Sequence, residues 1–492
     1  MVTQIRNRLL PFLVVLLIAI SAFAQDESDY YEIITLPTPE GVAFEVGGMA
    51  LMPDGAMAIA IRKGEVWLLE NPYEEDLESL RYRRIAMALH EPLGLLYHEG
   101  DLYTTQRSEL TRLRDLDGDR VIDEYETVSN AWGVTGNYHE YAYGPALDGE
   151  GRFWITLNQT IGVTVAKDDN AWRGWGVAID SDGTMTPMCA GMRSPCGVGS
   201  NGIGDVFFTD QQGEWVPTNS LHQLRRGVFY GHAVSLASCD REGSPLTHPG
   251  KVPSGIPIPE VRSALPDFRP PAVWFPYRKA GMSATGIVNA NSGGRFGPFD
   301  DQLFVGDFTM ALINRVALEK VNGEYQGAVF SFRRGFQCAI VRMATGTDGS
   351  LFVGETNRGW NSAGRTSYGL ERVIWKEKNP FEIKTMHATP DGFRLTFTET
   401  VDQKTAMNPD NYQLSSYTYL YHARYGSDEV DAKMLDVRNV SVTSDRLSAT
   451  LTVDGLREGY VHELSAEGVR SAAGAPLLHS TGYYTLNAIP ER

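Results

Sequence analysis

The chain has 492 residues and a formal net charge of −17 at pH 7, with 50 glycines and 10% aromatic residues. An acidic protein repels polyanions, which excludes nucleic acid and anionic membrane surfaces as partners and leaves cations and neutral sugars. The length exceeds one ordinary core and indicates two domains or one large repeat fold, while the glycine and aromatic content favours turn-rich β structure.

Residues 1–24 have the pattern of a secretory signal peptide. Arg6 and Arg8 precede an apolar run over residues 9–20, and Ala22-Phe-Ala24 supplies a small-residue cleavage site. The run is about a dozen residues, shorter than the ~20 that a membrane-spanning helix needs, and no later stretch is longer. We therefore expect a secreted or periplasmic protein that loses residues 1–24 and has no membrane span.

A loose repeat then recurs six times. Each unit has an apolar stretch, a tight Asp-Gly or similar turn, and two short β-rich segments. The units begin at Met49, Gly94, Tyr143, Cys196, Thr285 and Val341. Units of this kind match the four-stranded blades of about 40–50 residues that build a propeller, so residues 25–375 are predicted to form a six-bladed β-propeller. A two-sheet sandwich with chance repetition is the alternative.

The composition changes after Trp375. Residues 376–380 are typical of a polar linker, and residues 393–398 and 447–453 alternate between apolar and polar side chains. This alternation predicts half-buried antiparallel strands, and we interpret residues 381–492 as an immunoglobulin-like β-sandwich without its disulfide. Such a module more often spaces or docks a partner than performs chemistry.

Four cysteines are too few for a disulfide-built scaffold. Cys189 and Cys196 are the favoured pair, because a short loop that contains Pro195 can bring them together, although three pairings remain open for four cysteines. The absence of a Cys-x-x-Cys-His motif excludes a c-type haem on this sequence.

Residues 115–126 have the spacing of a calcium loop. Ca²⁺ prefers six to eight oxygen ligands. The oxygens available here come from five carboxylates and one carbonyl, those of Asp115, Asp117, Asp119, Asp123, Glu126 and Val121. Position 6 of the loop is Arg120, where a glycine is usual because the turn requires a positive φ. The alternative is an acidic, solvated hairpin loop.

Two further segments carry candidate site residues. His139 precedes the third repeat, and histidine is the side chain best suited to accept a proton near neutral pH, although a lone histidine is more often a structural hydrogen bonder. After a strand of the fourth repeat, Asp210 or Gln211 could bond sugar hydroxyls and Trp215 could stack on a sugar face. Packing between blades is the alternative for Trp215.

The order of motifs from about residue 90 to 375 resembles the soluble quinoprotein glucose and sorbosone (aldose sugar) dehydrogenases. The matching elements are His139, the Gly-Met-Arg-Ser-Pro-Cys-Gly segment at 191–197, Gln212-Gly-Glu, Thr285-Gly and Asp348-Gly. The acidic loop and the C-terminal module are similar to exported propeller proteins of the membrane-bound-dehydrogenase-like type. A c-type cytochrome segment frequently follows in those proteins and is not found in this sequence, so a separate electron carrier is expected.

The resemblance implies roles for individual residues. His139 would take the proton of the sugar C1 hydroxyl while a hydride passes to pyrroloquinoline quinone (PQQ), and Arg193 would contact that cofactor through its planar fork. The carbonyls of Gly213 and Glu214 would hold the Ca²⁺ of the cofactor, separate from the acidic loop.

The sequence also departs from the family at two places. Arg342 is all that remains, in a displaced position, of a late arginine pair that would bind the cofactor. The segment 307–309 reads Asp-Phe-Thr where the family has a cofactor-binding lysine. A polyanionic quinone would lose part of its counter-charge through these changes.

Two function classes follow. The first is an exported oxidoreductase that oxidises a sugar or sugar-derived alcohol at the mouth of the propeller, using PQQ. The alternative is a non-catalytic, calcium-stabilised propeller that binds a glycan or a partner protein. A propeller hydrolase of the lactonase kind, in which a central metal activates water, is a third possibility.

Overall fold

The structure, a computed structural model, describes residues 25–162 and 171–491. The predicted signal peptide at 1–24 lies outside these residues. Strands dominate the described chain, and its two α-helices are the short α1 (Ile258–Ala264) and α2 (Gln403–Ala406). None of the helices in the described part is long and apolar enough to cross a membrane. The prediction of an all-β fold is confirmed.

Three antiparallel sheets of four strands each follow one another along the first part of the chain. The first contains β2 (Val46–Leu51), β3 (Met57–Ile61), β4 (Glu65–Leu69) and β5 (Tyr82–Ala86). The second contains β6 (Leu95–His98), β7 (Asp101–Thr105), β8 (Leu110–Arg114) and β9 (Glu124–Ser129). The third contains β10 (Ala142–Leu147), β11 (Phe153–Leu157), β12 (Trp175–Ile179) and β13 (Met185–Ala190).

The fourth and fifth sheets repeat this order with one long insertion. The fourth contains β14 (Gly197–Ser200), β15 (Val206–Asp210), β16 (Asn219–Gln223) and β18 (Val273–Phe275). Between β16 and β18 the chain forms β17 (Ile256–Pro257) and α1. The fifth unit contains β19 (Ala284–Asn289), β20 (Leu303–Asp307), β21 (Leu312–Val321) and β22 (Glu324–Arg334).

The sixth sheet combines the two ends of this region. β23 (Ile340–Thr345), β24 (Leu351–Thr356) and β25 (Tyr368–Trp375) are completed by β1 (Tyr31–Thr35), which pairs with β25 from Tyr31↔Trp375 to Thr35↔Glu371. The repeat pattern did not predict β1, because β1 precedes the first repeat and lacks its turn. Pairing the N-terminal strand with the last sheet closes the ring and leaves no long free edge there.

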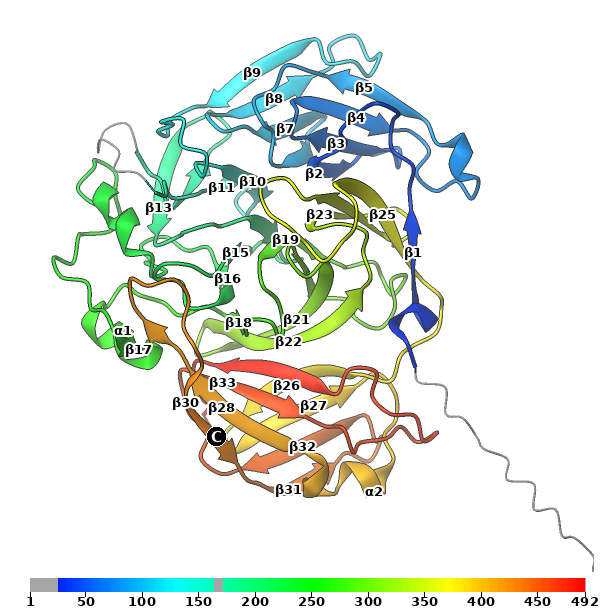
Figure 1. The fold of residues 1–492 in the computed structure, drawn as a ribbon, viewed down its shortest axis with the longest axis vertical. Helices are drawn as coiled ribbons and strands as arrows, with labels where there is room; N and C mark the ends of the chain where they lie inside the picture. The colour runs from blue at the N-terminus through cyan, green and yellow to red at the C-terminus, as the bar shows by residue number, and fades with distance from the viewer. Residues whose placement is uncertain (1–24, 163–170, 492) are drawn as a thin grey trace, which may run out of the picture.

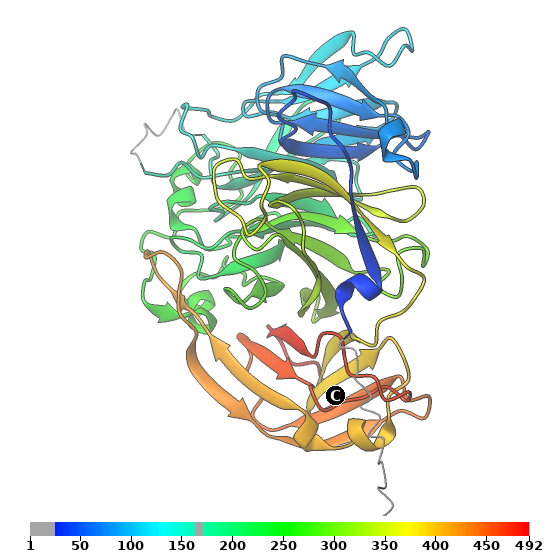
Figure 2. The same ribbon diagram turned by 45° about the vertical axis from the view of Figure 1, so that its right-hand side comes forward.

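The six units form a closed ring (Figures 1 and 2). The first strand of each unit contacts the first strand of the next, from β2 to β6, β10, β14, β19 and β23, and β23 contacts β2. The middle strands are buried on both faces, and every residue of β3 and β11 is buried. Apolar side chains therefore fill the spaces between neighbouring sheets, as in the cluster that joins the first and second units.

The C-terminal module has two sheets around one core. One sheet has the order β26 (Ile383–Thr389), β27 (Gly392–Phe397), β32 (Ser448–Val453) and β31 (Val437–Val442). The other has the order β34 (Thr481–Leu486), β33 (Tyr460–Ser465), β28 (Gln413–Thr418) and β30 (Val430–Leu435). Phe393, Leu451 and Leu464 meet in the shared core. The alternation predicted at 393–398 and 447–453 falls on β27 and β32.

The module is joined to the ring by backbone pairing and by a buried ionic network. β34 pairs with β22, so the second sheet continues the fifth unit. Arg315 of β21 is fully buried and donates hydrogen bonds to the carbonyls of Ile383 (2.6 Å) and Lys384 (3.1 Å). His479 lies between the carboxylates of Glu382 (2.6 Å) and Glu27 (3.0 Å).

Candidate functional site

A cavity of about 370 Å³ lies on the axis of the ring. Each unit contributes a residue at or near the start of its first strand to the cavity wall. These residues are Val46, Leu93, Tyr141, Cys196, Ser283 and Val341. The volume falls within the range of about 300–1,000 Å³ that is typical of ligand pockets.

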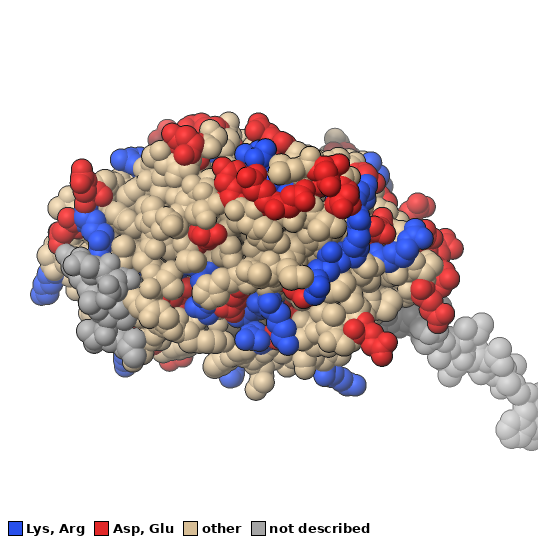
Figure 3. All heavy atoms as spheres, turned by 90° about the horizontal axis from the view of Figure 1, so that it is seen from above, with Lys and Arg blue, Asp and Glu red and all other residues tan. Residues whose placement is uncertain are grey.

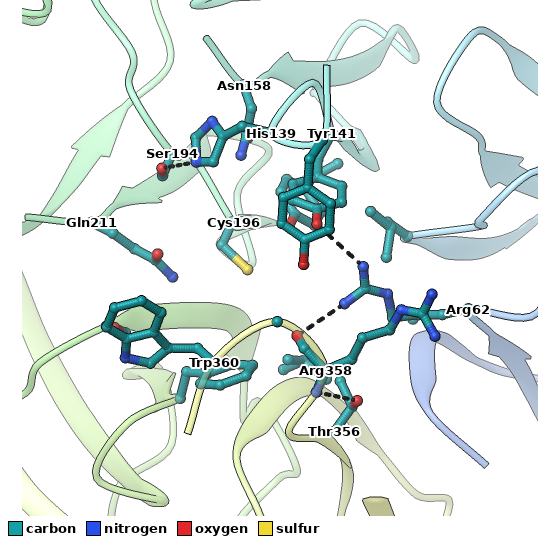
Figure 4. Close-up of a pocket in the computed structure, with 18 of the residues that line it drawn as sticks. Arg62, His139, Tyr141, Asn158, Ser194, Cys196, Gln211, Thr356, Arg358 and Trp360 are labelled. Carbon is teal, nitrogen blue, oxygen red and sulfur yellow. Dashed lines mark hydrogen bonds between the residues drawn. The ribbon is translucent and has the colours of Figure 1, made fainter. Parts of the chain in front are cut away.

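His139 lines one side of this cavity, just before β10 (Figure 4). Its Nδ1 lies 2.7 Å from the carbonyl oxygen of Gln159, which accepts a hydrogen bond only if Nδ1 is protonated. The lone pair is then on Nε2, which lies 2.8 Å from the hydroxyl of Ser194. Burial lowers the pKa of His139 to about 4. The imidazole is therefore neutral at pH 7, with its basic nitrogen on the Ser194 side.

Asp210, at the end of β15, holds the turn that places Ser194 beside His139. Its buried carboxylate accepts hydrogen bonds from the backbone N–H groups of Arg193 (2.8 Å), Ser194 (2.7 Å) and Gln211 (2.9 Å). Gln211 lines the cavity and Asp210 does not. The structure thus gives Asp210 a supporting position instead of the predicted contact with a sugar.

Four arginines line the cavity, and no described lining residue is an Asp, Glu or Lys. Arg62, Arg193 and Arg358 form ion pairs with Glu91, Glu214 and Glu45, respectively. Arg342 donates instead to the backbone carbonyls of Val341 (2.6 Å) and Leu93 (2.8 Å). Arg342 has no carboxylate partner within the described residues, so its charge is available to an anion.

Sequence reasoning missed Arg62 and Arg358, which Figure 4 shows across the cavity from His139 and Ser194. Arg358 lies two residues after the end of β24 at Thr356, and Arg62 follows directly after β3, the second strand of its unit, which ends at Ile61. Cavity-lining residues occupy the same position in the third, fourth and fifth units. They are Asn158, Gln211 and Phe308. Aligning the repeats at the ends of their second strands would have identified this ring of positions.

The segment 213–215 pairs with the C-terminal module and does not line the cavity. The Gly213 carbonyl, predicted to hold the calcium ion of a cofactor, accepts a hydrogen bond from Gly426 N–H (3.0 Å). Glu214 forms a β-bridge with Tyr425, and its carboxylate bonds Arg193 Nε (2.8 Å). The Trp215 ring lies 5.0 Å from the Tyr421 ring between centroids, so it packs at the junction.

The predicted disulfide between Cys189 and Cys196 is not formed, and all four cysteines are free and buried. Cys189 lies in a hydrophobic core between the third and fourth units, where burial raises the pKa of its thiol to about 12. Cys196 faces the cavity, with its Sγ 3.9 Å from Arg342 Nη1. The prediction was wrong because the short loop directs the two thiols into different environments.

The acidic loop lies between β8 and β9, outside the residues that line the cavity. Carboxylate oxygens of Asp115, Asp117 and Asp123 come within 4.8 Å of one another. Arg120 adopts a φ of 68°, the left-handed conformation expected of a glycine at this position.

Asp119 and Glu126, two other predicted ligands of this loop, are not among the three carboxylates that converge. Asp119 Oδ1 accepts the N–H of Val121 (2.7 Å), and Glu126 lies 3.5 Å from Arg112 Nη1. Figure 3 views the end of the molecule that carries β2–β9 and shows Asp and Glu side chains in several clusters over it, with Lys and Arg among them. Three carboxylates therefore gather in an acidic neighbourhood, without the full predicted ligand set.

Comparison with known proteins found no matching family model and no matching curated protein. Solved structures do match. A Thermus thermophilus protein named as an oxidoreductase (glucose dehydrogenase) superposes with a TM-score of 0.51 at 18% identity, over 70% of this chain and 100% of that one. A Trichoderma reesei protein of carbohydrate-active enzyme family AA12 gives 0.50 at 13% identity, over 70% and 96%.

The PQQ-bound form of an aldose sugar dehydrogenase from Streptomyces coelicolor gives 0.46 at 12% identity, over 70% and 98%. The two matches with TM-scores of 0.51 and 0.50 show that this chain shares their fold. The family resemblance that the sequence motifs indicated is thus confirmed for the fold. The share of this chain that is covered, 70%, is about the length of the ring without the C-terminal module.

Proposed function

We propose that the protein is an exported oxidoreductase that oxidises a sugar or a sugar-derived alcohol, using PQQ bound on the axis of a six-bladed propeller. The observation that carries this proposal is the axial cavity, in which a neutral histidine faces four arginines and, among the described lining residues, no carboxylate. The six sheets in a closed ring agree with six blades, and the two sheets around one core agree with an immunoglobulin-like module. The signal-peptide pattern supports a secreted or periplasmic location.

The lining residues fit a small planar polyanion. Arg193 and Arg342 would bind carboxylates of the cofactor, since a guanidinium fork matches paired carboxylate oxygens. Arg62 and Arg358 add guanidinium donors to the wall, each already paired with a glutamate. The segment that carries the lysine in the family contributes Phe308 instead. When bound, the quinone would accept the hydride from the sugar. We do not assign a calcium ion to the Gly213 and Glu214 carbonyls, because the first is bonded to Gly426.

His139 would act as the base. Its Nε2 would accept the proton of the reacting hydroxyl once the Ser194 hydroxyl turns away, and the bond to Gln159 keeps the required tautomer. Asp210 acts at a distance, because it fixes the backbone of Arg193 and Ser194. Electrons would pass on to a separate carrier.

The test is reduction of a dye by the full chain supplied with PQQ, Ca²⁺ and a panel of aldoses. We expect sugar-dependent reduction that falls about 100-fold or more in His139→Gln, since a general base contributes about 10²–10⁴ to the rate. Arg438→Gln, an exposed arginine of the C-terminal module, is the matched control and should keep full activity. Sugar-dependent reduction that is equal in His139→Gln would rule out the assigned base.

A non-catalytic glycan-binding propeller remains the second candidate. The engagement of segment 213–215 by the C-terminal module favours it, because that pairing removes the cation site that the resemblance implied. Glycan binding without cofactor that survives His139→Gln, together with no PQQ binding, would favour this candidate over the enzyme.

A further inference from the structure

A second cavity adjoins the axial one. It has a volume of about 690 Å³ and lies between the C-terminal module and the ring. Its walls include Tyr277, Lys279, Tyr419, His422, Asp428 and Glu429. Gln212 and Tyr425 line both cavities, so the two volumes meet at these side chains.

The loop that separates the cavities is fixed to the fourth unit. It follows β29 (Leu420–Tyr421), which pairs with β17. Backbone hydrogen bonds then run from Gly426 N–H to the Gly213 carbonyl (3.0 Å) and from Ser427 N–H to the Pro217 carbonyl (2.9 Å). A loop held by backbone bonds on both sides forms a permanent wall, and a preformed wall reduces the entropy cost of binding a ligand.

Tyr425 is the part of this loop that remains open to a ligand. Its side chain is 61% exposed although it stands among these fixed contacts. The Arg193 guanidinium carbon lies 5.2 Å from the centre of its ring. Trp360, 66% exposed, lines the axial cavity as well. Two large aromatic surfaces are therefore available at the mouth of the axial cavity.

The charges of the two cavities differ in kind. The axial cavity contains four arginines and no acidic or lysine side chain among its described lining residues, whereas the second contains both acidic and basic groups. In the second cavity the Lys279 ammonium is held by Glu429 (2.9 Å) and by Glu463 (2.7 Å). The charged lining residues of the second cavity are two bases, Lys279 and Arg424, and two acids, Asp428 and Glu429, and a lining without net charge suits a neutral ligand rich in hydroxyl groups.

We propose that the second cavity is a subsite for additional sugar units, so that the substrate is a neutral oligosaccharide whose reacting end lies near His139. Tyr425 forms the aromatic surface between the two subsites. This inference rests on the proposed function, since it assumes that the axial site takes a sugar. The C-terminal module is then a part of the binding site, and the sugar chain leaves the axis along it.

The test is calorimetric binding to the full chain without cofactor. The probes are glucose, cellobiose, cellotetraose and maltotetraose. We expect at least one tetrasaccharide to bind about tenfold or more tightly than glucose. Tyr425→Ala and Tyr277→Ala should each remove most of that gain, and Tyr425→Phe should keep it because the ring remains. Tyr125→Ala changes an exposed tyrosine of β9 and should behave as the wild type.

Equal affinity for glucose and the tetrasaccharides, or no binding of any of these sugars, overturns the inference. So does a length-dependent gain that Tyr425→Ala leaves intact, provided that the variant melts like the wild type. Dye reduction with PQQ is measured separately. Dye reduction without length-dependent binding rejects the second subsite alone, whereas length-dependent binding without PQQ binding rejects the oxidoreductase and keeps the subsite.

Discussion

His139 combines a specified tautomer with a suppressed charge. The Gln159 carbonyl fixes the proton on Nδ1, and burial disfavours the imidazolium form. The sequence motif selected this histidine and Arg193, and both line the axial cavity. It was not sufficient for Ser194, because a hydroxyl that contacts Nε2 depends on the turn held by Asp210 and leaves no pattern along the chain.

The titration of His139 is the prediction at this scale. Because its pKa is lowered to about 4, the base stays unprotonated down to about pH 5 and the acid limb of the pH–rate profile should lie near pH 4. NMR of the imidazole C2–H, assigned by its absence in His139→Gln, gives the same midpoint without cofactor. A midpoint near the ordinary value of about 6.5 would contradict the buried, neutral histidine.

At the scale of the elements, the repeats were readable because each Asp-Gly turn joins two strands of one sheet. Five of the six predicted repeats lie in four-stranded sheets, and the fifth supplies four strands of the eight-stranded sheet that continues into the C-terminal module. Two features had no local signal. β1 is a single strand that lies far in sequence from its partner β25. The insertion before β18 places the last strand of the fourth unit far in sequence from β16, the strand with which it pairs. Pairing between distant segments depends on ring closure and not on local composition.

Calcium binding by the 115–126 loop is the prediction at this scale. A cation would neutralise the carboxylates of Asp115, Asp117 and Asp123, and binding to the folded state alone raises the melting temperature. We expect Ca²⁺ to raise the melting temperature relative to a chelator. Asp117→Asn should abolish most of this rise in melting temperature. Asp436→Asn, which changes an exposed aspartate of the module, should leave the rise intact. An identical rise in both variants would place the ion elsewhere.

For the whole molecule, the junction between ring and module is the feature that the sequence did not predict. Residues 376–380 were interpreted as a linker to a separate domain. The structure instead continues the fifth unit into the module through β22 and β34, and the loop after β29 reaches the axial cavity. Backbone pairing across a predicted boundary has no signature in hydropathy or composition.

His479 makes the stability of this junction depend on pH. Burial alone would lower its pKa, but the carboxylates of Glu382 and Glu27 outweigh burial and raise it to about 9. A raised pKa gives stability that is complete below the unfolded value of about 6.5 and is lost as the pH rises through 9. The free energy of unfolding of the wild type, measured with urea, should exceed that of His479→Gln by about 3 kcal/mol at pH 6. This difference should decline by pH 10. A difference independent of pH would contradict the ionic role.

The central claim is that the axial cavity binds an anionic quinone beside a neutral base. Calorimetric titration of the full chain with PQQ tests this claim most directly. We predict one site per chain, weakened about tenfold or more in Arg342→Gln and unchanged in Arg438→Gln, because Arg342 is the cavity arginine without a carboxylate partner in the described chain. Absence of binding, or equal binding by both variants, would contradict the account.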